Sequence, residues 1–286
     1  MSEERKTENL DSPILDSGEN QKASKKLKTI IILSAVLVLI LLVVLFILIF
    51  VVFGTTESGE DDSDDDEIDD GSIIIYPTDT YTHCIIWLHG LDNLPNYFVD
   101  LFTKDIILSK IKNTKIILMR APNTTVSYFE YNTTSWFDIY SFPINDSDTY
   151  NFDDAKISSE KVQKRIEREA KKLGGKYENI FIGGHSQGAC VTLLTGYTVN
   201  YVLGGVLACS GIFFPQAEIV GNKNNLKVML GHGYNDTAIP LSYHNETVER
   251  ISNFTGVERH YYPDQAHNIG DEEKKDMGKF LDENMK

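Results

Sequence analysis

The feature that most limits the architecture of this chain is an apolar run near its beginning. It extends from Thr29 to Phe53 without a charged side chain. A helix rises about 1.5 Å per residue, so about 20 apolar residues cross the roughly 30 Å hydrocarbon core of a bilayer. A cleaved signal peptide is the alternative, but its apolar region is only about 7–15 residues long and ends in small residues. The run predicts one transmembrane helix over residues 29–53.

The charges on either side of this run predict its orientation. Four lysines stand just before it, and the next basic residue after it is Lys104. Lys and Arg close to a membrane span are retained on the cytoplasmic side. We therefore expect residues 1–28 to be a cytoplasmic tail, and the part after the span to lie in the lumen or outside the cell.

The segment that follows the span is strongly acidic. Residues 55–71 carry ten carboxylates and no Lys or Arg, out of a formal net charge of −15 for the whole chain. Such a segment repels itself and cannot bury apolar surface, so residues 54–71 are expected to form a disordered stem. It lacks the Gly and Glu spacing of an EF-hand calcium loop. The acidic balance also argues against nucleic acid as a partner.

From residue 72 onward, short β-branched runs alternate with helical patterns. Strands are expected at residues 73–76, 84–88, 115–119, 179–183, 205–209, 227–230 and 258–262, and helices at 158–173, 187–198 and 272–283. Several of the strands are apolar throughout, as strands buried on both faces of a parallel sheet are. The alternation predicts that residues 72–286 form one α/β domain with a doubly wound, mostly parallel sheet.

The strongest functional signal is the sequence Gly184-His185-Ser186-Gln187-Gly188. It matches G-x-S-x-G and lies between a predicted strand and a predicted helix, which is the context of a nucleophile elbow. Glycines are needed there because side chains would collide with neighbouring backbone in so sharp a turn. Ser186 is the candidate nucleophile; a serine in an ordinary turn is the alternative.

A serine hydroxyl is a weak nucleophile and needs a base. Where a serine stands on this kind of elbow, the acid and then the histidine follow it along the chain. His267 follows the last predicted strand, in the loop where the base is expected. Asp236 is the expected acid, because it follows the strand at 227–230 and could hold the His267 ring in one tautomer. Asp264 is the competing carboxylate, but it is only three residues from the base.

The remaining histidines after the serine receive lesser roles. His232 precedes the candidate acid and is expected to support the site. His260 falls within a predicted strand and is expected to pack or to be exposed. His244 falls in a polar helix and is expected at the surface.

The negative charge that develops on a carbonyl oxygen needs backbone N–H donors. One is expected from Gln187, directly after the nucleophile, and the other from the loop after the strand at 84–88. That loop reads His89-Gly90-Leu91-Asp92-Asn93, and Leu91 is the expected donor.

The three cysteines, Cys84, Cys190 and Cys209, each lie in or beside an apolar run. Buried cysteine behaves as a small apolar residue, so three buried free thiols are expected rather than a disulfide. No Cys or His spacing indicates a metal site, and no cofactor is expected.

Together these segments resemble the acyl-protein thioesterase and carboxylesterase/lysophospholipase family of α/β-hydrolases. The resemblance covers nearly all of residues 80–284 and rests on segments in family order: IIWLHGL, ILMRAPNTTVSYFEYNTTSWFDI, NIFIGGHSQGACVTLLTGY, GVLACSGIFFP, HGYNDTAIP and YYPDQAHNI. It implies Ser186, Asp236 and His267 as the triad, with Leu91 and Gln187 as oxyanion donors. It also implies that Trp136 and Phe137, in the family-specific stretch SWFD, line the mouth of the acyl site; core packing is the other interpretation. The chain departs from the family in reading HGLDNLPN where a glycine-rich loop is usual, and in its predicted membrane span.

These observations predict a membrane-anchored serine hydrolase that cleaves acyl esters or thioesters through an acyl-enzyme. A lumenal or extracellular domain favours lysophospholipids, lipid esters or exposed acylated proteins as substrates. The alternative is a catalytically silent hydrolase domain that serves as a membrane-tethered binding module.

Overall fold

The computed structural model describes Leu37 and residues 71–106, 111–144 and 147–285. The predicted tail (1–28), transmembrane helix (29–53) and stem (54–71) lie outside the described residues, apart from Leu37 and Gly71. Among the described residues, no helix combines the length and the apolar character that a bilayer crossing needs.

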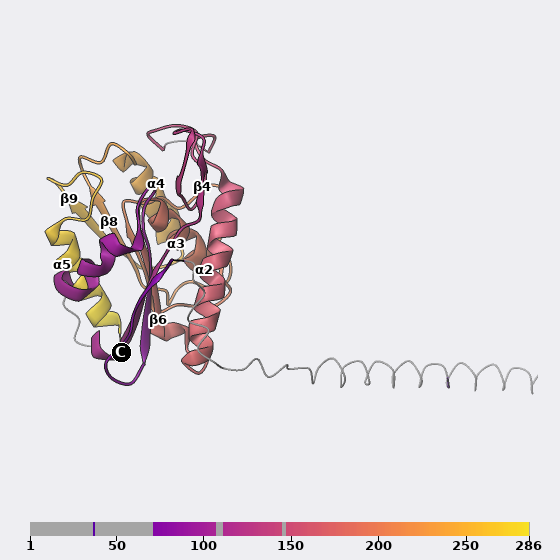
Figure 1. The fold of residues 1–286 in the computed structure, drawn as a ribbon, viewed down its shortest axis with the longest axis vertical. Helices are drawn as coiled ribbons and strands as arrows, with labels where there is room; N and C mark the ends of the chain where they lie inside the picture. Colours follow the sequence, from indigo (N-terminus) through magenta and orange to yellow (C-terminus); the bar gives the residue numbers. More distant parts are fainter. Residues whose placement is uncertain (1–36, 38–70, 107–110, 145–146, 286) are drawn as a thin grey trace, which may run out of the picture. The chain divides into compact units, whose positions relative to one another are not determined.

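The domain is built on a seven-stranded sheet with the strand order β1-β3-β2-β6-β7-β8-β9 (Figure 1). The edge strand β1 runs antiparallel to β3, and all other neighbours in this sheet are parallel. The strands are β1 Ile73–Ile75, β2 His83–Leu88, β3 Thr114–Met119, β6 Ile180–His185, β7 Gly205–Cys209, β8 Val228–Gly233 and β9 Val257–Tyr262. These are the seven strands expected from the sequence, with small shifts at their ends. The mostly parallel α/β fold is therefore confirmed.

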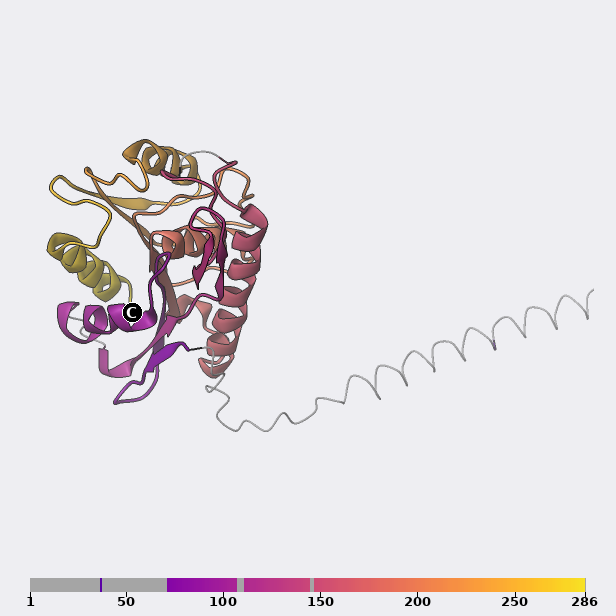
Figure 2. The same cartoon turned by 45° about the horizontal axis from the view of Figure 1, so that its top comes forward.

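Helices cover both faces of the sheet, as a doubly wound fold requires. They are α2 Phe152–Lys172, α3 Gln187–Thr198, α4 Leu241–Ser252 and α5 Asp271–Asn284. Figures 1 and 2 show α2 on one side of the sheet and α5 on the other. Because side chains alternate across a strand, Ile86 packs in the core under α2 and α3, whereas Ile85 packs in the core under α5.

The helix α2 begins six residues earlier than the sequence pattern predicts. Asn151 caps it, because its side-chain oxygen accepts hydrogen bonds from the amides of Asp153 and Asp154 at 3.0 and 3.2 Å. The carboxylates of these two aspartates lie in the first turn, where they also interact favourably with the positive end of the helix dipole. The helix ends where expected: Gly174 and Gly175 follow it with φ of 69° and 85°.

A second, two-stranded sheet was not expected from the sequence. The strands β4 Asn123–Val126 and β5 Tyr131–Thr134 form an antiparallel hairpin between β3 and α2. In Figure 1 this hairpin stands beside one end of α2. Its strands are rich in Thr and Asn; β4 is exposed apart from Val126, and β5 is exposed at its first two residues and buried at Thr133 and Thr134.

Candidate active site

Ser186 lies at the turn between β6 and α3. Its φ is 56° and its ψ −122°, a conformation that residues with a Cβ rarely adopt. Its amide donates to the carbonyl of Cys209 at 2.9 Å. A Cβ at Gly184 would lie 2.5 Å from the carbonyl carbon of Gly188, and one at Gly188 would lie 2.2 Å from the carbonyl oxygen of Leu88. The two glycines of the pattern are therefore sterically required, and the chain forms the expected sharp turn.

His267 lies between β9 and α5 and reaches the serine. Its Nε2 is 2.8 Å from Oγ of Ser186, and its Nδ1 is 2.7 Å from Oδ2 of Asp236. An ionised carboxylate only accepts hydrogen bonds, so Nδ1 is the donor to Asp236 and Nε2 is free to accept the serine proton. Ser186 is 9% exposed and the His267 side chain 25% exposed, so the serine end of this chain of hydrogen bonds is accessible to solvent.

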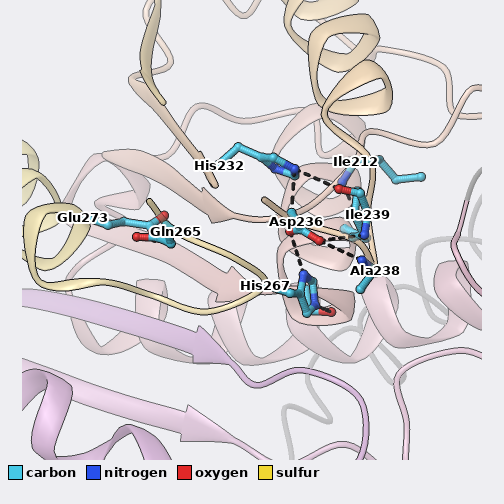
Figure 3. Close-up of polar contacts among 10 residues, drawn as sticks. Ile212, His232, Asp236, Ala238, Ile239, Gln265, His267 and Glu273 are labelled. Carbon is cyan, nitrogen blue, oxygen red and sulfur yellow. Dashed lines mark hydrogen bonds and ion pairs between the residues drawn. The ribbon is translucent and has the colours of Figure 1, made fainter. Parts of the chain in front are cut away.

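The carboxylate of Asp236 is held by the loop after β8. Its Oδ1 accepts from the amides of Ala238 and Ile239 at 3.0 and 2.9 Å, and Figure 3 shows its other oxygen directed at His267. Burial opposes ionisation, but the hydrogen bond and charge of His267 and the amide of Ile239 outweigh it, and the pKa of Asp236 is lowered. Asp264, the competing acid, is exposed. The hydrogen bond to His267 comes from Asp236.

Leu91 and Gln187 lie on two segments that meet beside Ser186. Gln187 is the first residue of α3, where an amide has no partner within the helix. Leu91 is half-buried in the loop after β2, and a Cβ at the preceding Gly90 would lie 3.2 Å from Cβ of Ser186. The fold thus brings both segments that carry the expected oxyanion donors to the serine.

Residues 69–285 match the family model described as Phospholipase/Carboxylesterase. The chain belongs to the phospholipase/carboxylesterase family. It is accordingly a serine hydrolase of the carboxylesterase and thioesterase kind, and the resemblance drawn from its sequence segments is confirmed.

Individual proteins of this family are similar to the chain in sequence and in fold. It is 30% identical over 213 residues to acyl-protein thioesterase 1 of Debaryomyces hansenii, covering 71% of this chain and 91% of the relative. The crystal structure of Arabidopsis thaliana SOBER1 superposes with a TM-score of 0.64 at 23% identity, covering 72% of this chain and all of the other. Zea mays acyl-protein thioesterase 2 gives a TM-score of 0.58 at 22% identity, covering 75% and 99%. The two structural likenesses support the fold.

Trp136 and Phe137, the expected substrate-binding residues of this family member, are each 1% exposed. The Trp136 indole nitrogen donates to the carbonyl of His89 at 2.7 Å. Phe137 packs edge-on against Phe214 with ring centroids 5.4 Å apart. Both side chains belong to the core, and Trp136 also contacts the loop that carries Leu91. Their role in substrate binding stays a prediction.

The histidines around the site differ in part from expectation. His232 supports it: its Nε2 donates to the carbonyl of Ile239 at 2.9 Å and lies 3.6 Å from Oδ2 of Asp236, on the side away from His267 (Figure 3). His244 is not at the surface. It is 1% exposed and packs against His232, with ring centroids 4.5 Å apart and the rings tilted by 35°. The prediction was wrong because the buried face of α4 includes this polar side chain.

Burial keeps the neighbouring imidazoles neutral. It lowers the pKa of His185 and of His244 to about 3, and His267 and His232 respectively add to the effect. It lowers the pKa of His89 to about 4. Three histidines near the site therefore carry no charge at pH 7, and none of them competes electrostatically with the His267–Asp236 pair.

Gln265 and Glu273 hold the His267 loop and were not among the residues expected at the site. The Gln265 side chain donates to Glu273 at 2.6 Å, and Figure 3 shows the two side chains next to each other. It also accepts from the Gly270 amide at 2.9 Å. One signal was available: Glu273 shares a stripe of α5 with Met277 and the following apolar residues, at helical spacing. A carboxylate on an apolar stripe indicates a buried partner.

The three cysteines are buried and unpaired, as expected. Within residues 71–106, 111–144 and 147–285, no group of three or more His, Cys, Asp or Glu side chains is placed to hold a metal ion.

Proposed function

We propose that this protein is a membrane-anchored esterase that cleaves acyl esters or thioesters through an acyl-enzyme on Ser186. The observation that carries the proposal is the continuous chain of hydrogen bonds from Oγ of Ser186 through His267 to Asp236. Such a chain supplies both a nucleophile and the base that activates it.

In the first step, Ser186 Oγ attacks the acyl carbonyl carbon while Nε2 of His267 takes the hydroxyl proton. The imidazolium that forms is stabilised by the carboxylate of Asp236. The C–O or C–S bond of the substrate then breaks, and the leaving alcohol or thiol takes the proton from His267. In the second step His267 removes a proton from water, which attacks the acyl carbonyl carbon. The bond between that carbon and Ser186 Oγ then breaks, Oγ takes the proton back from His267, and the carboxylic acid is released.

The carbonyl oxygen becomes negative in both steps, and the amides of Leu91 and Gln187 are proposed to donate hydrogen bonds to it. Donors of this kind are each worth about 10²–10³ in kcat in other serine hydrolases. Trp136 and Phe137 are proposed to lie at the mouth of the acyl site; Trp136 is hydrogen-bonded to the loop that carries Leu91, and Phe137 follows it in the core.

The proposed anchor is the apolar run at residues 29–53, with residues 1–28 in the cytoplasm and the domain from residue 72 in the lumen or outside the cell. Lysophospholipids, lipid esters and exposed acylated proteins are the substrates that meet a hydrolase held at that surface. The curated relative from Debaryomyces hansenii is named acyl-protein thioesterase 1, which supports an acyl group as the part recognised.

The test uses the full chain in detergent, with a fluorophosphonate probe and a panel of p-nitrophenyl esters, acyl thioesters and lysophospholipids. We expect the wild-type chain to be labelled and active, and Ser186→Ala to be unlabelled and orders of magnitude slower with an unchanged melting temperature. Turnover by Ser186→Ala above about a tenth of wild type would contradict the assignment of the nucleophile. An unlabelled, inactive wild-type chain would favour the binding-module alternative.

A further inference from the structure

The loop that carries Leu91 contains a backbone conformation that needs support. Asp92, directly after Leu91, has a φ of 54°, in the left-handed region that glycine prefers and that Asp tolerates. Its amide donates to the carbonyl of Thr134 at 2.9 Å. Its side chain accepts a hydrogen bond from the hydroxyl of Thr133. The left-handed residue is thus tied to the end of β5 through both its backbone and its side chain.

The same end of β5 holds the residues on both sides of Leu91. The Thr134 hydroxyl donates to the carbonyl of Asn93 at 2.6 Å. The Trp136 indole donates to the carbonyl of His89 at 2.7 Å. Leu91 lies in the middle of a loop that is fixed before it and after it. We call residues 133–137 the brace.

The brace also holds the second expected oxyanion donor. The side-chain oxygen of Gln187 accepts from the amide of Trp136 at 3.0 Å and from the hydroxyl of Ser135 at 3.1 Å. Its side-chain nitrogen donates to the carbonyl of Phe137 at 2.8 Å. All three contacts are buried. The two donors, which lie 96 positions apart in the sequence, are therefore attached to one short segment.

We propose that the brace sets the distance between the Leu91 and Gln187 amides, and that Asp92 and Thr133 are positioning residues for hydrolysis. This rests on the proposed function. Oxyanion donors act only when they are about 2.7–3.1 Å from the place the oxyanion will occupy. Thr133 is 8% exposed and Asp92 is exposed. Their hydrogen bond fixes the loop that carries Leu91, so we expect its loss to appear in kcat and in the binding of an oxyanion mimic.

The test compares Thr133→Val with two matched variants in the full chain. Thr133→Val keeps the side-chain shape and loses the hydroxyl; Thr133→Ser restores a hydroxyl. Thr124 faces Thr133 across the hairpin and is exposed, so Thr124→Val is the same substitution outside the brace. Both positions are the middle residue of an Asn-x-Thr sequence, so neither variant alters glycosylation.

The readouts are kcat and KM for a p-nitrophenyl ester, the Ki of an alkyl trifluoromethyl ketone, and the melting temperature. The ketone forms an oxyanion with the serine and so reports on its stabilisation. We expect Thr133→Val to lower kcat and raise Ki by about tenfold each, with KM within about twofold. Thr133→Ser should recover both values, and Thr124→Val should resemble wild type. Asp92→Gly, which fits the left-handed backbone, should repeat the Thr133→Val result even if that variant folds poorly.

Unchanged kcat and Ki in both Thr133→Val and Asp92→Gly overturn the brace while the proposed function stands. A rise in KM alone shows instead that the hairpin contacts substrate, and it also overturns the proposal. If Thr124→Val and Thr133→Val lose kcat equally, the effect is a general one on the hairpin. That result also overturns the proposal. A wild-type chain that neither turns over nor labels overturns the proposed function, and this proposal with it.

Discussion

Nε2 of Gln265 donates a hydrogen bond to Oε2 of Glu273 over 2.6 Å, in a place where Glu273 is fully buried. The carbonyl of Gln265 also accepts from the amide of Asn235, next to Asp236, at 3.0 Å. The start of α5 is thereby joined to the loops that carry His267 and Asp236. The geometry of the His267–Asp236 pair depends on a carboxyl group outside the site.

The buried carboxyl makes stability depend on pH. Burial raises the pKa of Glu273 from 4.5 to about 7, although the Gln265 hydrogen bond lowers it. The folded protein therefore holds this proton at pH values where the unfolded chain has lost it. The stability that this bound proton contributes is fully present below the pKa of Glu273 in the unfolded chain, and it is lost as the pH rises to about 7. The free energy of unfolding changes by about 3 kcal/mol over this window. Glu273→Gln cannot titrate. We predict that, as the pH rises from about 4.5 to about 7, its free energy of unfolding increases relative to that of the wild type.

The measurement is the melting temperature of both proteins at several pH values across this window. For a domain of this size, the melting temperature is expected to shift by about 2–4 °C for each kcal/mol of change in the free energy of unfolding. The adjacent and exposed Glu272→Gln is the control, and its difference from wild type should stay flat. A constant difference between Glu273→Gln and wild type would show that Glu273 does not titrate in this range.

Asp236, and not Asp264, is predicted to support the base. Asp236→Asn removes the charge that stabilises the His267 imidazolium and permits the wrong tautomer, so kcat should fall by about three to four orders of magnitude. Asp264 is exposed, and Asp264→Asn should change kcat by less than about twofold. Steady-state kinetics on one ester distinguishes the two, and the reverse pattern would identify Asp264 as the acid.

A buried ion cluster between α2 and β3 should make the loss of one of its members costly. The carboxylate of Glu169 is fully buried, lies 3.2 Å from Nζ of Lys115, and accepts from the Tyr81 hydroxyl at 2.7 Å. Arg165 also lies 3.8 Å from this carboxylate, so Glu169→Ala leaves two buried cations with one partner fewer and should lower the free energy of unfolding by about 3–5 kcal/mol. Denaturant unfolding checks this, with the exposed Glu160→Ala on the same helix as the control. Similar values for both variants would show that the cluster contributes little.

The proposed topology predicts which asparagines carry glycans. Asn132 and Asn235 are both exposed members of Asn-x-Thr sequences, whereas Asn145 lies outside the described residues. In a glycosylating host we expect Asn132 and Asn145 to be modified. Asn235 should stay bare, because it adjoins Asp236 and its side-chain Nδ2, the atom that would carry the glycan, donates to the carbonyl of Pro263 at 3.1 Å.

Glycosidase treatment should move the protein to a lower band, and Asn132→Gln should remove part of that shift while Asn235→Gln should not. An unshifted band, with the domain digested by protease added from the cytoplasmic side, would reverse the proposed topology. Cytosolic acylated proteins would then become the leading substrates.

Much of the fold could be predicted because its signals are local. The strand at Gly205–Cys209 is a continuous apolar run, and the elbow at Ser186 is specified by two glycines that the backbone needs. The order of serine, acid and base along the chain, together with the position of Asp236 and His267 in the loops after two different predicted strands, is enough to choose these two residues over Asp264. The hairpin of β4 and β5 gave no such signal, since Thr and Asn dominate both strands and no apolar alternation marks them.

The remaining parts of the site depend on contacts between distant segments. Thr133 meets Asp92 across 41 positions, and no local pattern joins them. The burial of His244 depends on where α4 docks against β8 and β9, which its own polar sequence does not reveal. The departure from a glycine-rich loop at HGLDNLPN was visible in the sequence, but nothing in it pointed to β5 as the support.

The buried thiols make the folded domain independent of the redox state around it. Cys84, Cys190 and Cys209 are at most 1% exposed and unpaired. Burial raises the pKa of Cys190 to about 12 and that of the other two well above the usual range. Thiolates are the reactive form, so neither an oxidising lumen nor a reducing cytoplasm should alter these side chains. Protein made in a bacterial cytoplasm for kinetics and protein made in a secretory pathway for topology should therefore have the same fold.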